Sequence, residues 1–123
     1  MIMGTKIWPD SNEWAGTILF LETSELYPSP DDIRFILRGM AAQGIIGCIN
    51  GILFGKPYDE KYYEEYKQVL TQVIGKECGR PDLPILYNLN FGHTSPICIL
   101  PYGITAEIDC NYKSVHLLES AVI

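Results

Sequence analysis

The chain has 123 residues, which is enough for one globular domain and too short for two of ordinary size. A hydrophobic content of 47% can fill a core and excludes an intrinsically disordered chain. Nine Lys and Arg against fifteen Asp and Glu give a net charge of -6, which argues against a nucleic-acid partner.

The apolar segments and the cysteines indicate where the protein resides and whether its thiols are free. No apolar run approaches the roughly 18 residues that span a membrane, and the first residues lack the apolar stretch of a secretory signal, so we expect a cytoplasmic protein without membrane contact. None of the four cysteines stands in a C-x-x-C pair. We therefore favour free and mostly buried thiols, with Cys78 as the exposed one, and expect no metal and no cofactor.

The first third of the chain predicts a connector, a strand and a helix. Residues 1–16 show neither a helical nor an alternating period and are expected to be irregular. Residues 17–21 form a continuous apolar run, which is typical of a strand buried on both faces. A helix is expected to begin at Pro30, which suits the first helical position, with Ser29 before it as the capping residue. This helix is expected to end at Gly44.

The middle of the chain predicts strand, helix, strand. Residues 45–54 are apolar and are expected to be a second buried strand. Residues 62–74 show apolar side chains at helical spacing, with Gly75 as the stop. The tyrosines of this helix are expected to pack in the core with their hydroxyls at its rim. Residues 84–89 then form a third strand.

The last third predicts short strands. Residues 97–100, 104–108 and 115–118 are rich in β-formers and are separated by turn residues. The predicted fold is therefore α/β, with parallel strands joined by helical crossovers and a C-terminal antiparallel β meander that extends or covers the sheet.

Two polar residues stand where an α/β sheet gathers its chemistry, at the carboxyl ends of strands. Glu22 directly follows the first strand, and His93 lies in the turn after the third strand. If those strands are neighbours, the carboxylate can fix the imidazole tautomer and leave the other ring nitrogen free to act as a base. Glu25 is a second acid near the same loop and could be the true partner or a substrate contact. His116 alternates with apolar residues in the last strand and is expected on a solvent face.

Each of these residues also has a common non-catalytic explanation. A glutamate at a strand end is usually solvated, and a lone histidine in a loop is usually a surface residue. No serine lies in a G-x-S-x-G elbow, and Ser95 is too close in sequence to His93 to be sharply presented to it. A Gly-rich phosphate loop, a zinc-type spacing and a calcium loop are also missing from the sequence.

A series of short motifs, in order, resembles the carboxyl-terminal domain of the LD-carboxypeptidase and microcin C immunity peptidase family of serine peptidases. The motifs cover nearly the whole chain and are Gly4-Thr5, Trp8-Pro9, Gly16-Thr17-Ile18-Leu19-Phe20-Leu21-Glu22, Gly44-Ile45, Gly51-Ile52-Leu53-Phe54-Gly55, Asn90-Phe91-Gly92-His93 and Leu100-Pro101-Tyr102-Gly103.

The resemblance implies a swivelling β/β/α type of domain and a triad split between two domains. Residues 1–16 would be the inter-domain connector, and residues 17–123 the carboxyl-terminal domain that supplies Glu22 and His93. The nucleophilic serine and the oxyanion hole would lie on an amino-terminal domain that is absent from this chain, so the chain alone is expected to be inactive. A homodimer of the full enzyme is also implied.

The resemblance leaves two substrate classes open. One branch of the family trims a D-amino acid from murein tetrapeptides, and the other cleaves the amide between an aminoacyl group and a nucleotide-like moiety. The run from Glu22 to Glu25, leading into Pro28-Ser29-Pro30, is more similar to the second branch. The alternative from another class is a non-catalytic binding or interaction module. It predicts a closed polar surface near Glu22, whereas half of an enzyme should expose apolar area there.

Overall fold

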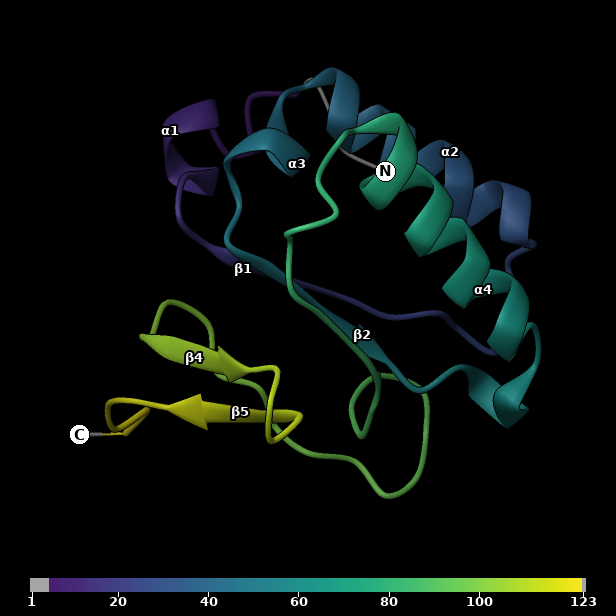
Figure 1. Ribbon diagram of the computed structural model, residues 1–123. Coiled ribbons are helices and arrows are strands. Elements are labelled where there is room, and N and C mark those ends of the chain that lie inside the picture. Colours follow the sequence, from purple (N-terminus) through teal and green to yellow (C-terminus); the bar gives the residue numbers. More distant parts are fainter. Residues whose placement is uncertain (1–4, 123) are drawn as a thin grey trace.

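The structure is a computed structural model and describes residues 5–122. Its centre is a parallel sheet in the order β1-β2-β3, made of Ile18–Leu21, Gly51–Gly55 and Ile85–Leu89. Helices cover one face of this sheet, and a separate two-stranded antiparallel sheet lies on the other side (Figure 1). The α/β class and its parallel strands with helical crossovers are confirmed.

The helical layer consists of three helices and a π-helical extension. They are α2 (Pro30–Ala42), the single turn α3 (Ile45–Cys48), α4 (Tyr63–Leu70) and η2 (Thr71–Glu77). The start of α2 is the one predicted: the Ser29 hydroxyl accepts the Asp32 N–H, and the Asp32 carboxylate accepts the Ser29 N–H.

Alternation along the strands divides the apolar side chains between two cores. Leu19, Ile52 and Phe54 point toward the helices, whereas Phe20 and Leu53 belong to the cluster on the hairpin side. Gly51 completes this second face, because a Cβ there would stand 2.5 Å from Ile108 Cδ1 of the hairpin. The result is a helix, sheet and hairpin stack, as the β/β/α expectation requires.

The second predicted strand is partly wrong. Residues 45–48 form the helical turn α3, and the strand itself is limited to Gly51–Gly55. The chain enters α3 through Gly44 in the left-handed region, at φ 79°. The buried isoleucines of this stretch satisfy the core equally well from a helical turn, so an apolar run alone could not distinguish the two states.

The helix expected over residues 62–74 is present but does not stop at Gly75. It continues as η2 to Glu77, and the Cys78 N–H donates to the Val73 carbonyl at 2.8 Å. Tyr66 lies in the core as expected, 1% exposed. The irregular segment before β1 contains one helical turn, α1 (Ser11–Trp14), while residues 1–4 of the predicted connector lie outside the described residues.

The predicted C-terminal meander is a hairpin. β4 (Ala106–Asp109) and β5 (Ser114–Leu117) pair antiparallel, and the Asp109 carboxylate accepts two N–H groups of the turn. The segment 97–100 is not a strand: Ile97 and Ile99 are 63% and 92% exposed, so this apolar segment crosses the surface.

The cysteines are free, but their expected burial is wrong in part. Cys98 and Cys110 are exposed, whereas Cys78, expected to be the exposed one, is half-buried against the core. Burial raises the pKa of the Cys78 thiol.

Candidate functional site

Glu22 and His93 come together at the carboxyl end of the sheet, although their strands are not neighbours. β2 lies between β1 and β3, so the condition of neighbouring strands, under which the two residues were expected to meet, is not fulfilled. The loop after β3 reaches β1 by crossing the end of β2. A Cβ on Gly55, the last residue of β2, would stand 2.8 Å from the Phe91 carbonyl oxygen, so this glycine allows the loop to pass over the strand end.

Gly92 brings the loop against Glu22. Its φ of +89° lies in the region that favours glycine, and a Cβ there would stand 2.1 Å from Glu22 Oε2 and 2.8 Å from Glu22 Cβ. His93 therefore follows a residue that must lack a side chain. Sequence reasoning noted a glycine in this turn but missed its role; a Gly directly before the histidine was the available signal.

The imidazole of His93 lies between two carboxylates. His93 Nδ1 is 3.5 Å from Glu22 Oε2, and Nε2 is 3.3 Å from Glu25 Oε2. All three side chains are about half exposed: 46% for His93, 46% for Glu22 and 56% for Glu25. Both distances exceed those of ideal hydrogen bonds.

This arrangement can orient a base but does not itself contain a nucleophile. A carboxylate on Nδ1 stabilises the ring when Nε2 takes up a proton. Within residues 5–122, no hydrogen bond joins a ring nitrogen of His93 to a serine or cysteine side chain, and the polar contacts of both nitrogens are to carboxylates. Across the same range, no group of three or more His, Cys, Asp or Glu side chains could hold a metal ion.

The second histidine lies elsewhere. His116 is exposed on β5, as expected, and its Nε2 is 2.8 Å from the Ser114 hydroxyl oxygen. Sequence reasoning missed this contact, for which the signal was the two-residue spacing that places both side chains on one face of a strand.

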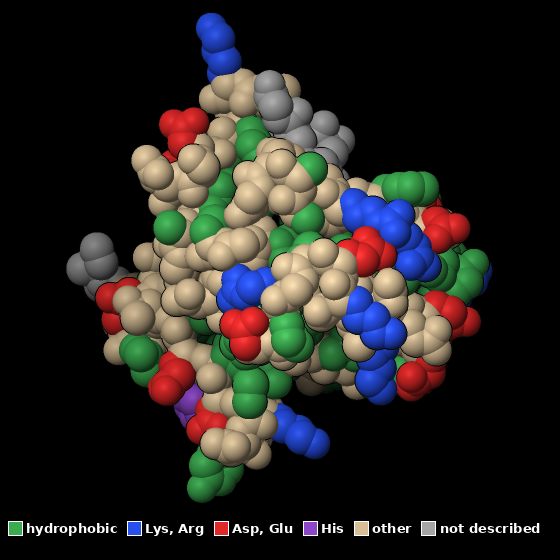
Figure 2. Space-filling view, turned by 45° about the horizontal axis from the view of Figure 1, so that its top comes forward, with side chains coloured by type: hydrophobic (Ala, Val, Ile, Leu, Met, Phe, Trp, Pro, Cys, Tyr) green, Lys and Arg blue, Asp and Glu red, His purple; other side chains and the backbone are tan. Residues whose placement is uncertain are grey.

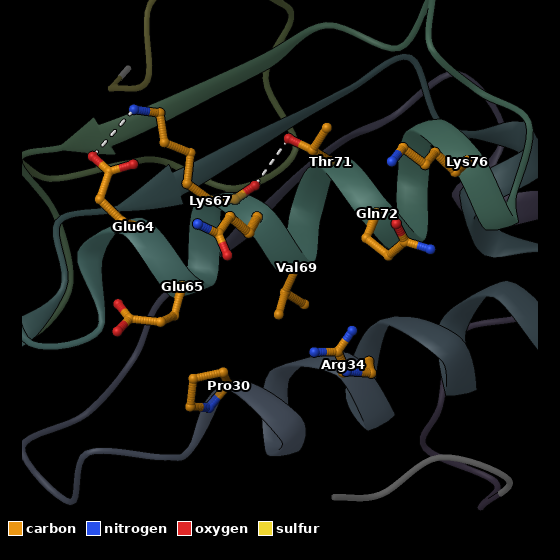
Figure 3. A pocket seen from close by; sticks show the side chains of 10 residues that line it. Pro30, Arg34, Glu64, Glu65, Lys67, Val69, Thr71, Gln72 and Lys76 are labelled. Carbon is orange, nitrogen blue, oxygen red and sulfur yellow. Dashed lines mark hydrogen bonds and ion pairs between the residues drawn. The ribbon is translucent and has the colours of Figure 1, made fainter.

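A groove of about 710 Å³ lies between α2 and the helix formed by α4 and η2 (Figure 3). Some of its polar groups already interact within the protein: Lys67 Nζ is 3.5 Å from Glu64 Oε1, and the Thr71 hydroxyl donates to the Lys67 carbonyl. Acidic and basic side chains also intermingle over the helical side of the molecule (Figure 2). The groove is a solvated helical surface with no connection to His93.

A second cavity, of about 830 Å³, separates β1 from the hairpin. Phe20 and Tyr102 form part of its wall, with ring centroids 5.0 Å apart, and Phe20 also packs edge-on against Phe91 of the His93 loop. This cavity therefore shares a wall with the loop that carries the histidine.

In the described part of the chain, no helix is long and apolar enough to cross a membrane.

An α/β domain that presents a carboxylate–histidine pair at the carboxyl end of its sheet is thus the class of protein defined by the fold and the site. A family model described as the LD-carboxypeptidase C-terminal domain matches residues 1–108. The chain belongs to this family.

Two relatives extend the comparison. A protein of Treponema pallidum (strain Nichols) described as "Putative carboxypeptidase" is 25% identical over 115 residues, which are 94% of this chain and 32% of that protein. The crystal structure of an MccF-like protein from Streptococcus pneumoniae in complex with AMP superposes with a TM-score of 0.82 at 40% identity, over 91% of this chain and 31% of that one. The chain spans about a third of the length of either relative.

Proposed function

We propose that this chain supplies the glutamate and the histidine of a Ser-Glu-His triad, as the carboxyl-terminal part of a serine carboxypeptidase-type amide hydrolase. The observation that carries the proposal is the approach of Glu22 Oε2 to His93 Nδ1 at 3.5 Å. Glu22 thus lies beside one ring nitrogen, and Glu25 lies beside the other at 3.3 Å. Family membership supports the same reaction class.

The chemistry assigns one role to each residue. Glu22 holds the imidazole with its proton on Nδ1. His93 Nε2 takes the proton of a serine hydroxyl while the serine oxygen bonds to the substrate carbonyl carbon, and it later gives that proton to the leaving amine. The serine and the oxyanion hole come from a second domain, which is the partner that this proposal requires.

The surface around the pair supports a covering partner. Leu26, one residue after Glu25, is 84% exposed, and Ile99 and Tyr102 beyond the histidine loop are 92% and 84% exposed. Apolar side chains this exposed are typical of a contact surface rather than of a closed polar rim. A half-exposed base also needs cover, because water screens its charge and competes for its lone pair.

The substrate is proposed as an amide of a small peptide or of an aminoacyl nucleotide, with Glu25 as a substrate contact. Its carboxylate lies beside the reacting nitrogen and suits a cationic group such as a free amine. AMP in the structure of the MccF-like protein favours testing the nucleotide class first. A homodimer stays a prediction, which light scattering can test.

A domain exchange tests the function. This chain would replace the matching third of the Streptococcus pneumoniae MccF-like protein, and hydrolysis of a murein tetrapeptide and of an aminoacyl-nucleotide amide would be followed by chromatography, with the parent protein as reference. His93→Ala and Glu22→Gln should lower kcat by about 10⁴-fold or more, as for triad members in other serine hydrolases. His116→Ala is the matched control and should stay within about twofold of the unmutated chimera.

The same experiment can reject the proposal. A folded chimera that hydrolyses either substrate equally well with and without His93 would exclude the triad role. A folded chimera that binds substrate without cleaving it, while the parent cleaves it, would favour a non-catalytic binding module. The 123-residue chain by itself is expected to show no hydrolysis.

A further inference from the structure

Glu25 lies against the ring nitrogen that the serine would need. We infer that Glu25 competes with Glu22 for the single proton of neutral His93 and so sets its tautomer balance, which makes Glu25 a positioning residue. The geometric basis is symmetrical: Glu22 Oε2 lies 3.5 Å from Nδ1, and Glu25 Oε2 lies 3.3 Å from Nε2. The consequence for catalysis, though not the tautomer balance itself, rests on the proposed function.

The local fold directs both carboxylates to one imidazole. Thr23, between them in sequence, is buried at 3% exposure and anchors the segment. After it the chain turns, because the Ser24 carbonyl accepts the Tyr27 N–H at 3.1 Å and the Ser24 hydroxyl accepts the Leu26 N–H at 3.3 Å. This turn brings Glu25 back to the histidine that Glu22 already contacts.

Neutral imidazole carries one proton, so the two carboxylates cannot both be satisfied. With the proton on Nδ1, Glu22 accepts it and Nε2 keeps a free lone pair. With the proton on Nε2, Glu25 accepts it and the lone pair is on Nδ1. Neither the distances nor the exposed fractions of 46% and 56% favour one carboxylate strongly, so both tautomers should be populated in the free domain.

Only one of these tautomers can act as the base. A serine hydroxyl can pass its proton to Nε2 when that nitrogen holds the lone pair, which requires the remaining proton on Nδ1 beside Glu22. Glu25 stabilises the opposite form. A serine arriving at Nε2 would displace Glu25, donate to the lone pair and thereby select the productive tautomer. Arrival of the nucleophile and preparation of the base are then one coupled event.

Nitrogen chemical shifts of the imidazole test this directly in the 123-residue chain. Long-range ¹H–¹⁵N correlation spectra at alkaline pH, where imidazoles are neutral, distinguish protonated from unprotonated ring nitrogens. The chain has two histidines, and a His116→Gln variant assigns the signals. For His93 the unmutated chain should show intermediate shifts at both nitrogens.

Removal of each carboxylate should move the balance in opposite directions. Glu25→Ala should shift the tautomer ratio toward Nδ1–H by about two- to fivefold, in proportion to the loss of a half-exposed charged contact. Glu22→Ala should shift it toward Nε2–H. Glu107→Ala is the matched control, because Glu107 pairs with His116 across the hairpin, and it should leave the shifts of His93 unchanged.

Two results would overturn the inference: a His93 that is purely Nδ1–H in the unmutated chain, or an unchanged ratio in Glu25→Ala. Glu25→Gln, which keeps the shape and loses the charge, should shift the ratio in the same direction and guards against a local distortion by alanine. The inference and the proposed function fail separately. Tautomer shifts with an inactive chimera would leave the inference standing, and an active triad with no tautomer shift would remove it.

Discussion

Gly92→Ala tests whether the approach of the histidine loop to Glu22 depends on a missing side chain. The new Cβ would stand 2.1 Å from Glu22 Oε2 and 2.8 Å from Glu22 Cβ, at a φ of +89°. The carboxylate end can swing away, but Cβ of Glu22 is tied to the backbone after β1. The loop must therefore move, and His93 must move with it.

The magnitude has two parts. A left-handed backbone conformation costs an alanine about 1–2 kcal/mol, and forcing a methyl group into an occupied space adds about 1–3 kcal/mol. Gly44→Ala is the matched control for the first part, since its φ is +79° and nothing lies within 4 Å of its Cβ position. The free energy of unfolding should fall by at least about 1 kcal/mol more in Gly92→Ala than in Gly44→Ala.

Urea denaturation of both variants measures this difference, and with a slope of about 1–3 kcal/mol per molar urea it amounts to a midpoint shift of a few tenths of a molar or more. The His93 ring signals should also move in Gly92→Ala and stay in place in Gly44→Ala. Equal destabilisation of the two variants, with unchanged His93 signals, would show that the close approach to Glu22 does not position the histidine.

Three further predictions concern stability. Leu37→Ala, at a side chain with 0% exposure, should cost about 2–5 kcal/mol in urea denaturation, and a loss below 1 kcal/mol would contradict its place in the core. Burial raises the pKa of Tyr66 to about 12, and its hydroxyl donates to the Pro28 carbonyl. The native state therefore keeps this proton to a higher pH than the unfolded chain does, so the free energy of unfolding should fall as pH rises from 10 to 12. In Tyr66→Phe this fall should be less steep. The substitution should itself lower the free energy of unfolding by about 1 kcal/mol at pH 7. The hydrogen bond from Arg38 lowers the pKa of the Glu77 carboxyl. The stabilisation by this ion pair is therefore present above the ordinary pKa of glutamate and is lost as pH falls through the lowered pKa. In Glu77→Gln the free energy of unfolding should depend less on pH in the acid range, and an unchanged pH dependence would refute the linkage.

Local signals in the sequence predict the helical layer well. Ser29 and Pro30 mark the start of α2 because capping and the restricted proline φ act within a few residues. The error at residues 45–48 has the opposite origin. Isoleucines are buried there by contacts with distant segments, and a run of apolar residues does not record whether the backbone is extended or helical.

The predicted strand at 97–100 failed for a related reason. Ile97 and Ile99 are exposed in this chain, and nothing in the order of the residues distinguishes an exposed segment from a core strand.

The candidate pair was predictable in identity and less so in its construction. The rule that chemistry gathers at the carboxyl ends of strands selected Glu22 and His93, and the family resemblance supported them. The strand order was not predictable, because it depends on contacts between residues that are far apart in the sequence. The crossing of β2 by the histidine loop rests on the contact between Gly55 and Phe91, 36 positions apart, which no local pattern reveals.

Gly55 under the histidine loop and Gly92 within it also limit how this site can change. At Gly55 and at Gly92 the neighbouring atoms already occupy the place of a Cβ, so any amino-acid substitution at either position adds atoms where there is no room. Improvement of the site by mutation is closed at these two positions. Glu25, exposed and close to the same imidazole, is open to substitution. Directed evolution of this domain should therefore change the environment of His93 through Glu25 and leave Gly55 and Gly92 unchanged.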